Sequence, residues 1–177
     1  MRIILVGKKG IGKTRVCERI VQKAKENHYT CCGILTHKSS NKLVVEDVAT
    51  CQKEVLALQK ADILEKPGGT SFCCFTFFDE AFEFAEKALL RNGDLLVIDE
   101  FGPMELESKG ISNALSAFVS SGSSNSIMVV RNEIKNRVLQ LLKCDVRIIE
   151  VLPENREELP ASLFRDCLLY TSDAADE

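Results

Sequence analysis

Glycine, lysine and threonine residues near the start of the chain are spaced for phosphate binding. Residues 7–14 match the pattern G-x-x-x-x-G-K-[ST] at every fixed position. Glycines in this pattern keep side chains away, so that backbone N–H groups can converge on phosphate oxygens. A lysine here reaches the β- and γ-phosphates, and a threonine offers its hydroxyl to Mg²⁺. The pattern predicts nucleotide binding by Gly7, Lys8, Lys9, Gly10, Ile11, Gly12, Lys13 and Thr14.

Two adjacent acids follow an apolar run in the middle of the chain. The run is residues 95–98, and Asp99 and Glu100 come directly after it. P-loop proteins keep the carboxylate that holds Mg²⁺ at the end of such a strand, so we expect Asp99 and Thr14 to bind the metal. Glu100 is placed to orient and deprotonate a water for attack on the γ-phosphate. We therefore expect Glu100 and Lys13 to be the catalytic residues, with Glu100 as the base.

Two further charged residues are weaker candidates. Arg131 ends the apolar run 127–130 and is expected at the same sheet edge as Asp99. An arginine there can contact the γ-phosphate or the base, although a surface arginine fits the sequence equally well. Glu105 fits the first turn of a helix better than a ligand position.

Strands and helices alternate along the chain around these residues. Apolar runs predict buried strands at 2–6, 95–98, 127–130 and 146–151. Helical spacing of apolar residues follows the glycine loop and recurs from Asp79, the expected N-cap, to Asn92-Gly93, and at 111–119 and 133–142. Pro153 is expected to open a short terminal helix. This alternation predicts a three-layer α/β fold, with a mostly parallel sheet between helices on both faces.

The segment 31–59 has a different, β-like pattern. Runs at 31–36, 43–48 and 54–59 are separated by polar residues, among them the turn signal 39–42. We expect a β-hairpin insertion that projects from the main sheet. The aromatic stretch 72–78 has no clear assignment from the sequence; it fits core packing better than a docking surface.

Composition indicates one folded domain. The chain has 177 residues, 45% hydrophobic and 28% charged, without an apolar run of about 18 residues or a secretory signal, so we expect a cytoplasmic protein. Residues 167–177 resemble the in-frame translation of a sequencing adaptor, and we expect a domain over 1–166 and a non-native tail. Three of the 26 acids lie in that tail, which leaves 23 acidic and 23 basic residues. A neutral body gives no reason to expect nucleic acid or a membrane as a partner.

The eight cysteines do not favour a metal site or disulfides. Cys31-Cys32 and Cys73-Cys74 are adjacent pairs rather than the C-x-x-C of a zinc knuckle. In a strand, neighbouring side chains point to opposite faces, so the two sulfurs of each pair would diverge.

The chain resembles the small cancer-related nucleoside-triphosphatase family, which is also known from thermophiles. The resemblance rests on residues 7–14, 33–36, 130–131 and 153–156, and most specifically on Val97-Ile-Asp-Glu-Phe-Gly-Pro-Met-Glu-Leu106. It implies a RecA-like P-loop fold and slow, Mg²⁺-dependent hydrolysis of ATP, GTP and other nucleoside triphosphates to the diphosphate and phosphate. It also implies phosphate binding by residues 7–14, and metal or water handling by Asp99 and Glu100. Arg15 departs from the family, which usually has a second Thr or Ser there.

Two other functions fit the same motifs. One is a nucleotide or small-molecule kinase, but kinases usually carry an arginine-rich lid, and no arginine occurs between Thr36 and Phe78. The other is a nucleotide-dependent regulatory switch whose output is a partner interaction. The sequence does not predict the oligomeric state.

Overall fold

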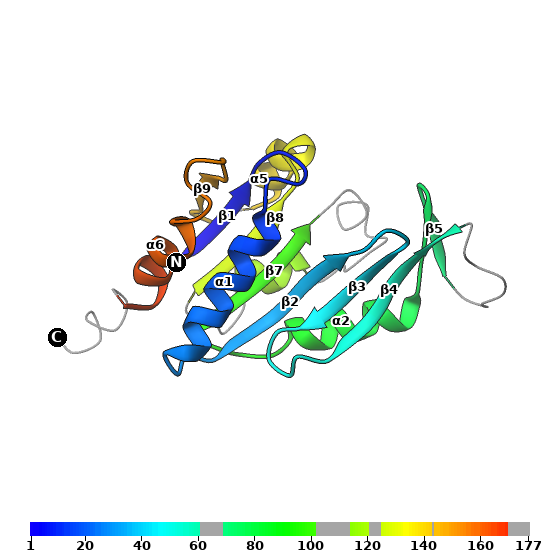
Figure 1. Ribbon diagram of the computed structural model, residues 1–177, viewed down its shortest axis with the longest axis horizontal. Coiled ribbons are helices and arrows are strands. Elements are labelled where there is room, and N and C mark those ends of the chain that lie inside the picture. The colour runs from blue at the N-terminus through cyan, green and yellow to red at the C-terminus, as the bar shows by residue number, and fades with distance from the viewer. Residues whose placement is uncertain (61–68, 102–113, 121–124, 143, 170–177) are drawn as a thin grey trace.

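The computed structural model describes residues 1–60, 69–101, 114–120, 125–142 and 144–169. Its strands form one sheet in the order β5-β6-β4-β3-β2-β7-β8-β1-β9 (Figure 1). The strands are β1 (Arg2–Val6), β2 (Cys31–Lys38), β3 (Lys42–Asp47), β4 (Lys53–Gln59), β5 (Thr70–Phe72), β6 (Phe75–Phe77), β7 (Leu95–Phe101), β8 (Asn125–Val130) and β9 (Arg147–Glu150).

The part of the sheet from β2 to β9 is parallel. β7 pairs in parallel with β2 and β8, and β1 pairs in parallel with β8 and β9. Every residue of β8 is buried, as expected for a central strand of a sheet that is covered on both faces. β8 lies between β1 and β7, so the strand before the glycine loop and the strand that ends in the acids are separated by one strand. All parallel strands end at the same edge.

An antiparallel extension completes the sheet. β2 and β3 form the expected hairpin, and β4 pairs antiparallel with β3 and β6. The aromatic stretch forms a second hairpin, β5–β6, in which Cys73 and Cys74 make the turn between the paired Phe72 and Phe75. The ring of Phe77 stacks on that of Phe82 at 5.9 Å, so this stretch packs within the fold.

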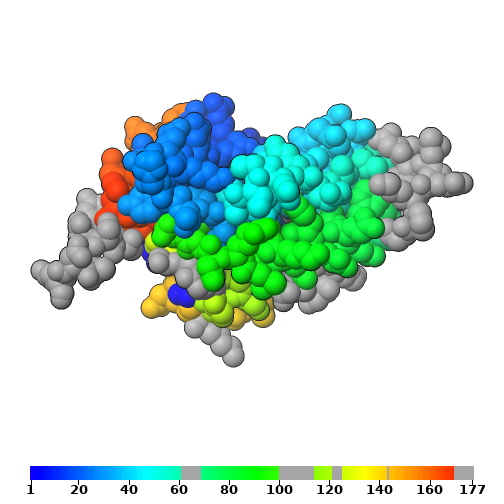
Figure 2. Space-filling view, turned by 90° about the horizontal axis from the view of Figure 1, so that it is seen from below, coloured from blue at the N-terminus to red at the C-terminus, as the bar shows by residue number. Residues whose placement is uncertain are grey.

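Helices cover both faces of the sheet and bury two separate cores. On one face lie α1 (Lys13–Glu26), α6 (Leu159–Phe164) and a π-helical turn (Arg165–Leu169). On the other lie α2 (Asp79–Leu89), α4 (Ala114–Ser120), a 3-10 turn (Asn132–Ile134) and α5 (Lys135–Leu141). In Figure 2, α1 (blue) lies in the upper part of the view and α2 (green) lies below it. The alternating burial of sheet residues, with Val97 in one core and Ile98 in the other, confirms the three-layer prediction.

Several expected element ends differ from the structure. The strand expected at 95–98 continues through Asp99 and Glu100 to Phe101, so the two acids lie within β7 rather than after it. Phe78 rather than Asp79 is the N-cap of α2; Asp79 is the first helical residue, where a negative charge is still favourable, and the helix ends at Leu89. Pro153 does not open a helix. It lies in a series of turns, because the Asn155 side chain accepts a hydrogen bond from the Leu152 N–H, and α6 begins only at Leu159.

Packing continues past the expected boundary at Asp166. Cys167 and Leu168 are buried in the core beneath α1, and the Tyr29 hydroxyl donates to the Leu168 carbonyl at 3.1 Å. Among the described residues, no helix combines the length and the apolar character needed to cross a bilayer.

Candidate nucleotide-binding site

The glycine loop connects β1 to α1 and has the backbone conformations that its glycines allow. Gly12, the N-cap of α1, has a φ of 107°, in the left-handed region that favours glycine. A Cβ on Gly7 would lie 2.8 Å from the Val151 carbonyl oxygen, because the start of the loop is in close contact with the residue that follows β9. The N-terminus of α1 is therefore directed at the loop, where the helix dipole favours an anion.

The Lys13 side chain folds back over this loop. Its ammonium donates to the carbonyl oxygens of Gly7 at 2.8 Å and Lys8 at 3.0 Å. This places a positive charge on the loop itself, beside the N-terminus of α1. Charge and helix dipole thus favour the same occupant, a phosphate group.

Asn132, which the sequence motifs did not identify, holds the start of the loop. It follows β8, and its side-chain oxygen accepts a hydrogen bond from the Gly7 N–H at 3.2 Å. The only sequence signal is its position, directly after Arg131 at the end of an apolar run.

Asp99 lies buried near the end of β7, with 1% of its surface exposed. Its carboxylate accepts a hydrogen bond from the Thr36 N–H at 3.2 Å, and the Thr36 hydroxyl donates to the Asp99 carbonyl. Burial, and next the charge of Asp99, raise the pKa of the Cys17 thiol.

A β-bulge occurs where the two acids lie. Ile98 is opposite Met128 and Phe101 is opposite Val130, so β7 has one more residue than β8 in this interval. Asp99 and Glu100 together are opposite Val129. In a regular strand, adjacent side chains would point to opposite faces, whereas a bulge relaxes that alternation and re-aims a side chain. The structure describes the backbone of Glu100 but not its side chain.

The remaining candidates fall into two groups. Arg131 comes directly after β8, exposed at the carboxyl edge of the parallel strands as expected. Glu105 lies outside the described residues. Gly7, Thr14, Asp99 and Arg131 therefore all lie at or near one edge of the sheet, where α/β proteins bind their ligands.

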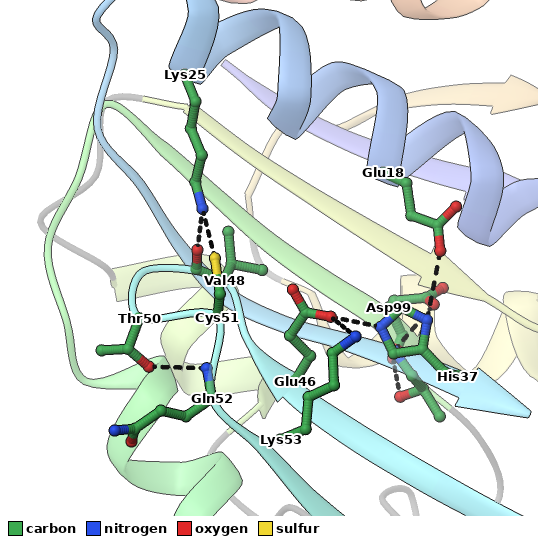
Figure 3. A network of polar contacts seen from close by, with 11 residues as sticks. Glu18, Lys25, His37, Glu46, Val48, Thr50, Cys51, Gln52, Lys53 and Asp99 are labelled. Carbon is green, nitrogen blue, oxygen red and sulfur yellow. Dashed lines mark hydrogen bonds and ion pairs between the residues drawn. The ribbon is translucent and has the colours of Figure 1, made fainter.

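A polar network joins α1 to the antiparallel strands beside this edge (Figure 3). One ring nitrogen of His37 lies 2.7 Å from a Glu46 carboxylate oxygen, and the other lies 3.4 Å from Glu18 on α1. Lys53 contacts the same Glu46 oxygen at 3.0 Å. His37 thus links three elements, α1, β2 and β3, next to Thr36, which contacts Asp99.

The paired cysteines do not come together. Cys31 and Cys32 are buried in β2, whereas Cys73 and Cys74 are exposed at the tip of the β5–β6 hairpin. Burial raises the pKa of Cys31 to about 11, so this thiol is protonated at neutral pH. Within the described residues, no group of three or more His, Cys, Asp or Glu side chains is placed to hold a metal ion.

Comparisons with known proteins give a family and several relatives. The family described as NTPase matches residues 2–164. The chain is 28% identical to the nucleoside-triphosphatase THEP1 of Methanopyrus kandleri, with 89% of each chain covered. It is also 28% identical to the protein of that name from Pyrococcus abyssi, with 94% of this chain and 92% of that protein covered.

Two solved structures share the fold. The crystal structure of THEP1 from Aquifex aeolicus matches 95% of this chain and 99% of its own, with a TM-score of 0.75 and 19% identity. The solution structure of a human cancer-related nucleoside triphosphatase matches 92% of this chain and 94% of its own, with a TM-score of 0.68 and 21% identity. Together with the sheet order, these matches confirm the RecA-like P-loop fold.

Proposed function

Because this chain belongs to the NTPase family, and is on that ground a nucleoside-triphosphatase, we propose that it hydrolyses ATP, GTP and other nucleoside triphosphates to the diphosphate and phosphate in a Mg²⁺-dependent reaction. The observation that carries the proposal is the order β7-β8-β1 of parallel strands. It puts the acid-bearing strand two positions from the strand that leads into the glycine loop, which is roughly 10 Å at ordinary strand spacing. A triphosphate on the loop then extends toward the acids.

Residues of this chain divide the work of the reaction. The loop N–H groups and Lys13 bind the phosphates and stabilise the negative charge that develops on the γ-phosphate. Glu100 orients a water in line with the γ-phosphorus and takes its proton as the new P–O bond forms. The bond between γ-phosphorus and the bridging oxygen breaks, and the diphosphate leaves. Arg131 contacts the γ-phosphate or the base.

Thr14 and Asp99 are the residues that would hold Mg²⁺. Both offer oxygen atoms, which this cation prefers, and both lie at or near the carboxyl edge of the parallel strands. Bound there, the ion would supply positive charge against the phosphate oxygens.

The test is phosphate release from ATP, GTP, CTP and UTP, with Mg²⁺ and with EDTA. We expect release with all four substrates in Mg²⁺ and essentially none in EDTA. Release should not require an added acceptor. Consumption of ATP only in the presence of an acceptor would instead support a kinase, and equal rates with and without EDTA would remove the metal from the proposal.

A further inference from the structure

A cavity borders the glycine loop. It has a volume of about 240 Å³, and its lining includes Gly10, Gly12, Arg15, Arg19, Arg156 and Glu157. The lining residues come from the loop, the first turns of α1 and the turns between β9 and α6. The cavity therefore directly adjoins the backbone that is expected to hold phosphates.

The wall formed by the β9–α6 turns is well fixed. The Asn155 side chain donates to the Glu150 carbonyl at 2.9 Å and accepts from the Leu152 N–H, also at 2.9 Å. These bonds set the direction of the next residue, Arg156, whose guanidinium donates to the Ile11 carbonyl of the loop at 3.4 Å. The Arg156 stem lies 3.8 Å from the point where a Cβ on Gly12 would be.

Charge in the cavity is mostly positive. Arg19 forms an ion pair with Glu157, and Arg156 lies 3.6 Å from the other oxygen of the same carboxylate. The hydrogen bond from Arg19 is the main cause that holds the pKa of Glu157 below its usual range. Two guanidinium groups thus contact one carboxylate, and Arg15 adds a third arginine to the lining. Guanidinium groups are planar and only donate hydrogen bonds, and they stack on aromatic faces.

We infer that this cavity binds the nucleoside half of the substrate, with the guanidinium plane of Arg156 against the base and Arg15 donating to the ribose or the α-phosphate. The inference rests on the proposed function, because it takes the phosphates to lie on the glycine loop. When the phosphates lie on the loop, the nucleoside can extend into the adjoining cavity. The planar guanidinium groups there can stack on the face of a base and donate hydrogen bonds to the oxygen atoms of a sugar. The Arg19–Glu157 ion pair fixes the α1 side of the cavity to its β9–α6 side.

The experiment compares two ligands that differ only in the nucleoside side of the molecule. Titration calorimetry with Mg²⁺ measures the Kd of ADP and of inorganic pyrophosphate for the full chain. The variants are Arg156→Ala, Arg156→Lys and Arg15→Ser. The matched control is Arg165→Ala, which removes an exposed arginine from the π-helical turn that follows α6. Thermal unfolding of each variant checks that it is folded.

We expect wild-type protein to bind ADP more tightly than pyrophosphate. Arg156→Ala should weaken ADP binding about tenfold and leave pyrophosphate binding within about twofold. Arg156→Lys should recover little, because lysine keeps the charge but not the plane. Arg15→Ser should weaken ADP more than pyrophosphate, and the control should change neither.

Two results would overturn the inference while leaving the proposed function intact. If Arg156→Ala and Arg15→Ser weaken both ligands equally, the cavity binds phosphate rather than a nucleoside. If neither variant changes ADP binding, the nucleoside lies elsewhere. A wild-type protein that binds neither ligand would contradict the proposed function and, with it, this inference.

Discussion

The position of the Lys13 side chain supports the glycine loop as the phosphate-binding site. Its ammonium donates hydrogen bonds to the carbonyl oxygens of Gly7 and Lys8, and both of these residues belong to the loop itself. We expect Lys13→Ala to weaken ADP binding at least about 100-fold, because a charge-assisted contact to phosphate is lost. Calorimetry measures this, with the exposed Lys87→Ala on α2 as control. Wild-type affinity in Lys13→Ala would exclude the loop as the phosphate site.

We expect Asn132 to affect nucleotide binding indirectly, because its side chain positions the glycine loop rather than contacting the phosphates. Asn132→Ala removes the acceptor of the Gly7 N–H, and we expect a several-fold weaker Kd for ADP and a loss of about 1 kcal/mol in the free energy of unfolding. Asn136→Ala, an exposed asparagine on α5, is the control. Equal behaviour of the two variants would mean that this hydrogen bond does not position the loop.

Gly33 is a point of close approach between the paired strands β2 and β7. Its φ is 101°, and a Cβ there would lie 2.0 Å from the Val97 carbonyl oxygen of β7. Gly33→Ala should therefore cost about 3 kcal/mol or more in the free energy of unfolding, measured in urea. Gly93→Ala, where the nearest atom is 3.0 Å away, should cost less. A Gly33→Ala variant as stable as wild type would contradict this packing.

Asp94 fastens the start of β7 to the segment before β2. Its carboxylate accepts from the Thr30 N–H and the Thr30 hydroxyl, both at 2.7 Å, and these bonds hold the pKa of Asp94 below its ordinary value. Because the folded-state pKa is depressed, the stabilisation is complete above the unfolded-state value near 3.8 and is lost as the pH falls through the folded-state value.

We expect Asp94→Asn to lower the free energy of unfolding by about 0.5–1 kcal/mol at pH 6, a modest value because the site is exposed. The difference from wild type should shrink as the pH drops below about 4. Urea unfolding across pH 3–6 measures it, and the difference should also shrink in a Thr30→Val background. A difference that stays constant with pH would show that charge is not its source.

Local sequence patterns predicted the helices and strands, whereas the details of the site depend on contacts between segments that are distant in the sequence. The glycine loop and the apolar run before Asp99 could be recognised because each pattern is contained in one short segment. The bulge at Asp99 and Glu100 could not, since it depends on the register with β8. The hydrogen bond from the Gly7 N–H to Asn132 could not be predicted from the sequence either, because 125 positions separate the two residues.

The whole molecule brings together at one edge residues that are far apart in the chain. Two hydrophobic cores, one on each face of the sheet, hold the five parallel strands in place. The carboxyl ends of three of these strands carry the glycine loop, the two acids and Arg131. The three-layer arrangement followed from the alternation of strands and helices. The β5–β6 hairpin did not, because its aromatic side chains gain their burial from contacts with α2 and β4 rather than from a pattern of their own.

The most direct test of the account compares binding and turnover in Glu100→Gln. Glutamine keeps the size of the side chain but cannot accept the proton of the attacking water. We predict an ADP Kd within about threefold of wild type, together with a rate of phosphate release from ATP that is about 10²–10⁴ lower. Phosphate release at the wild-type rate in Glu100→Gln would contradict the claim that the acids of β7 and the glycine loop form one catalytic site.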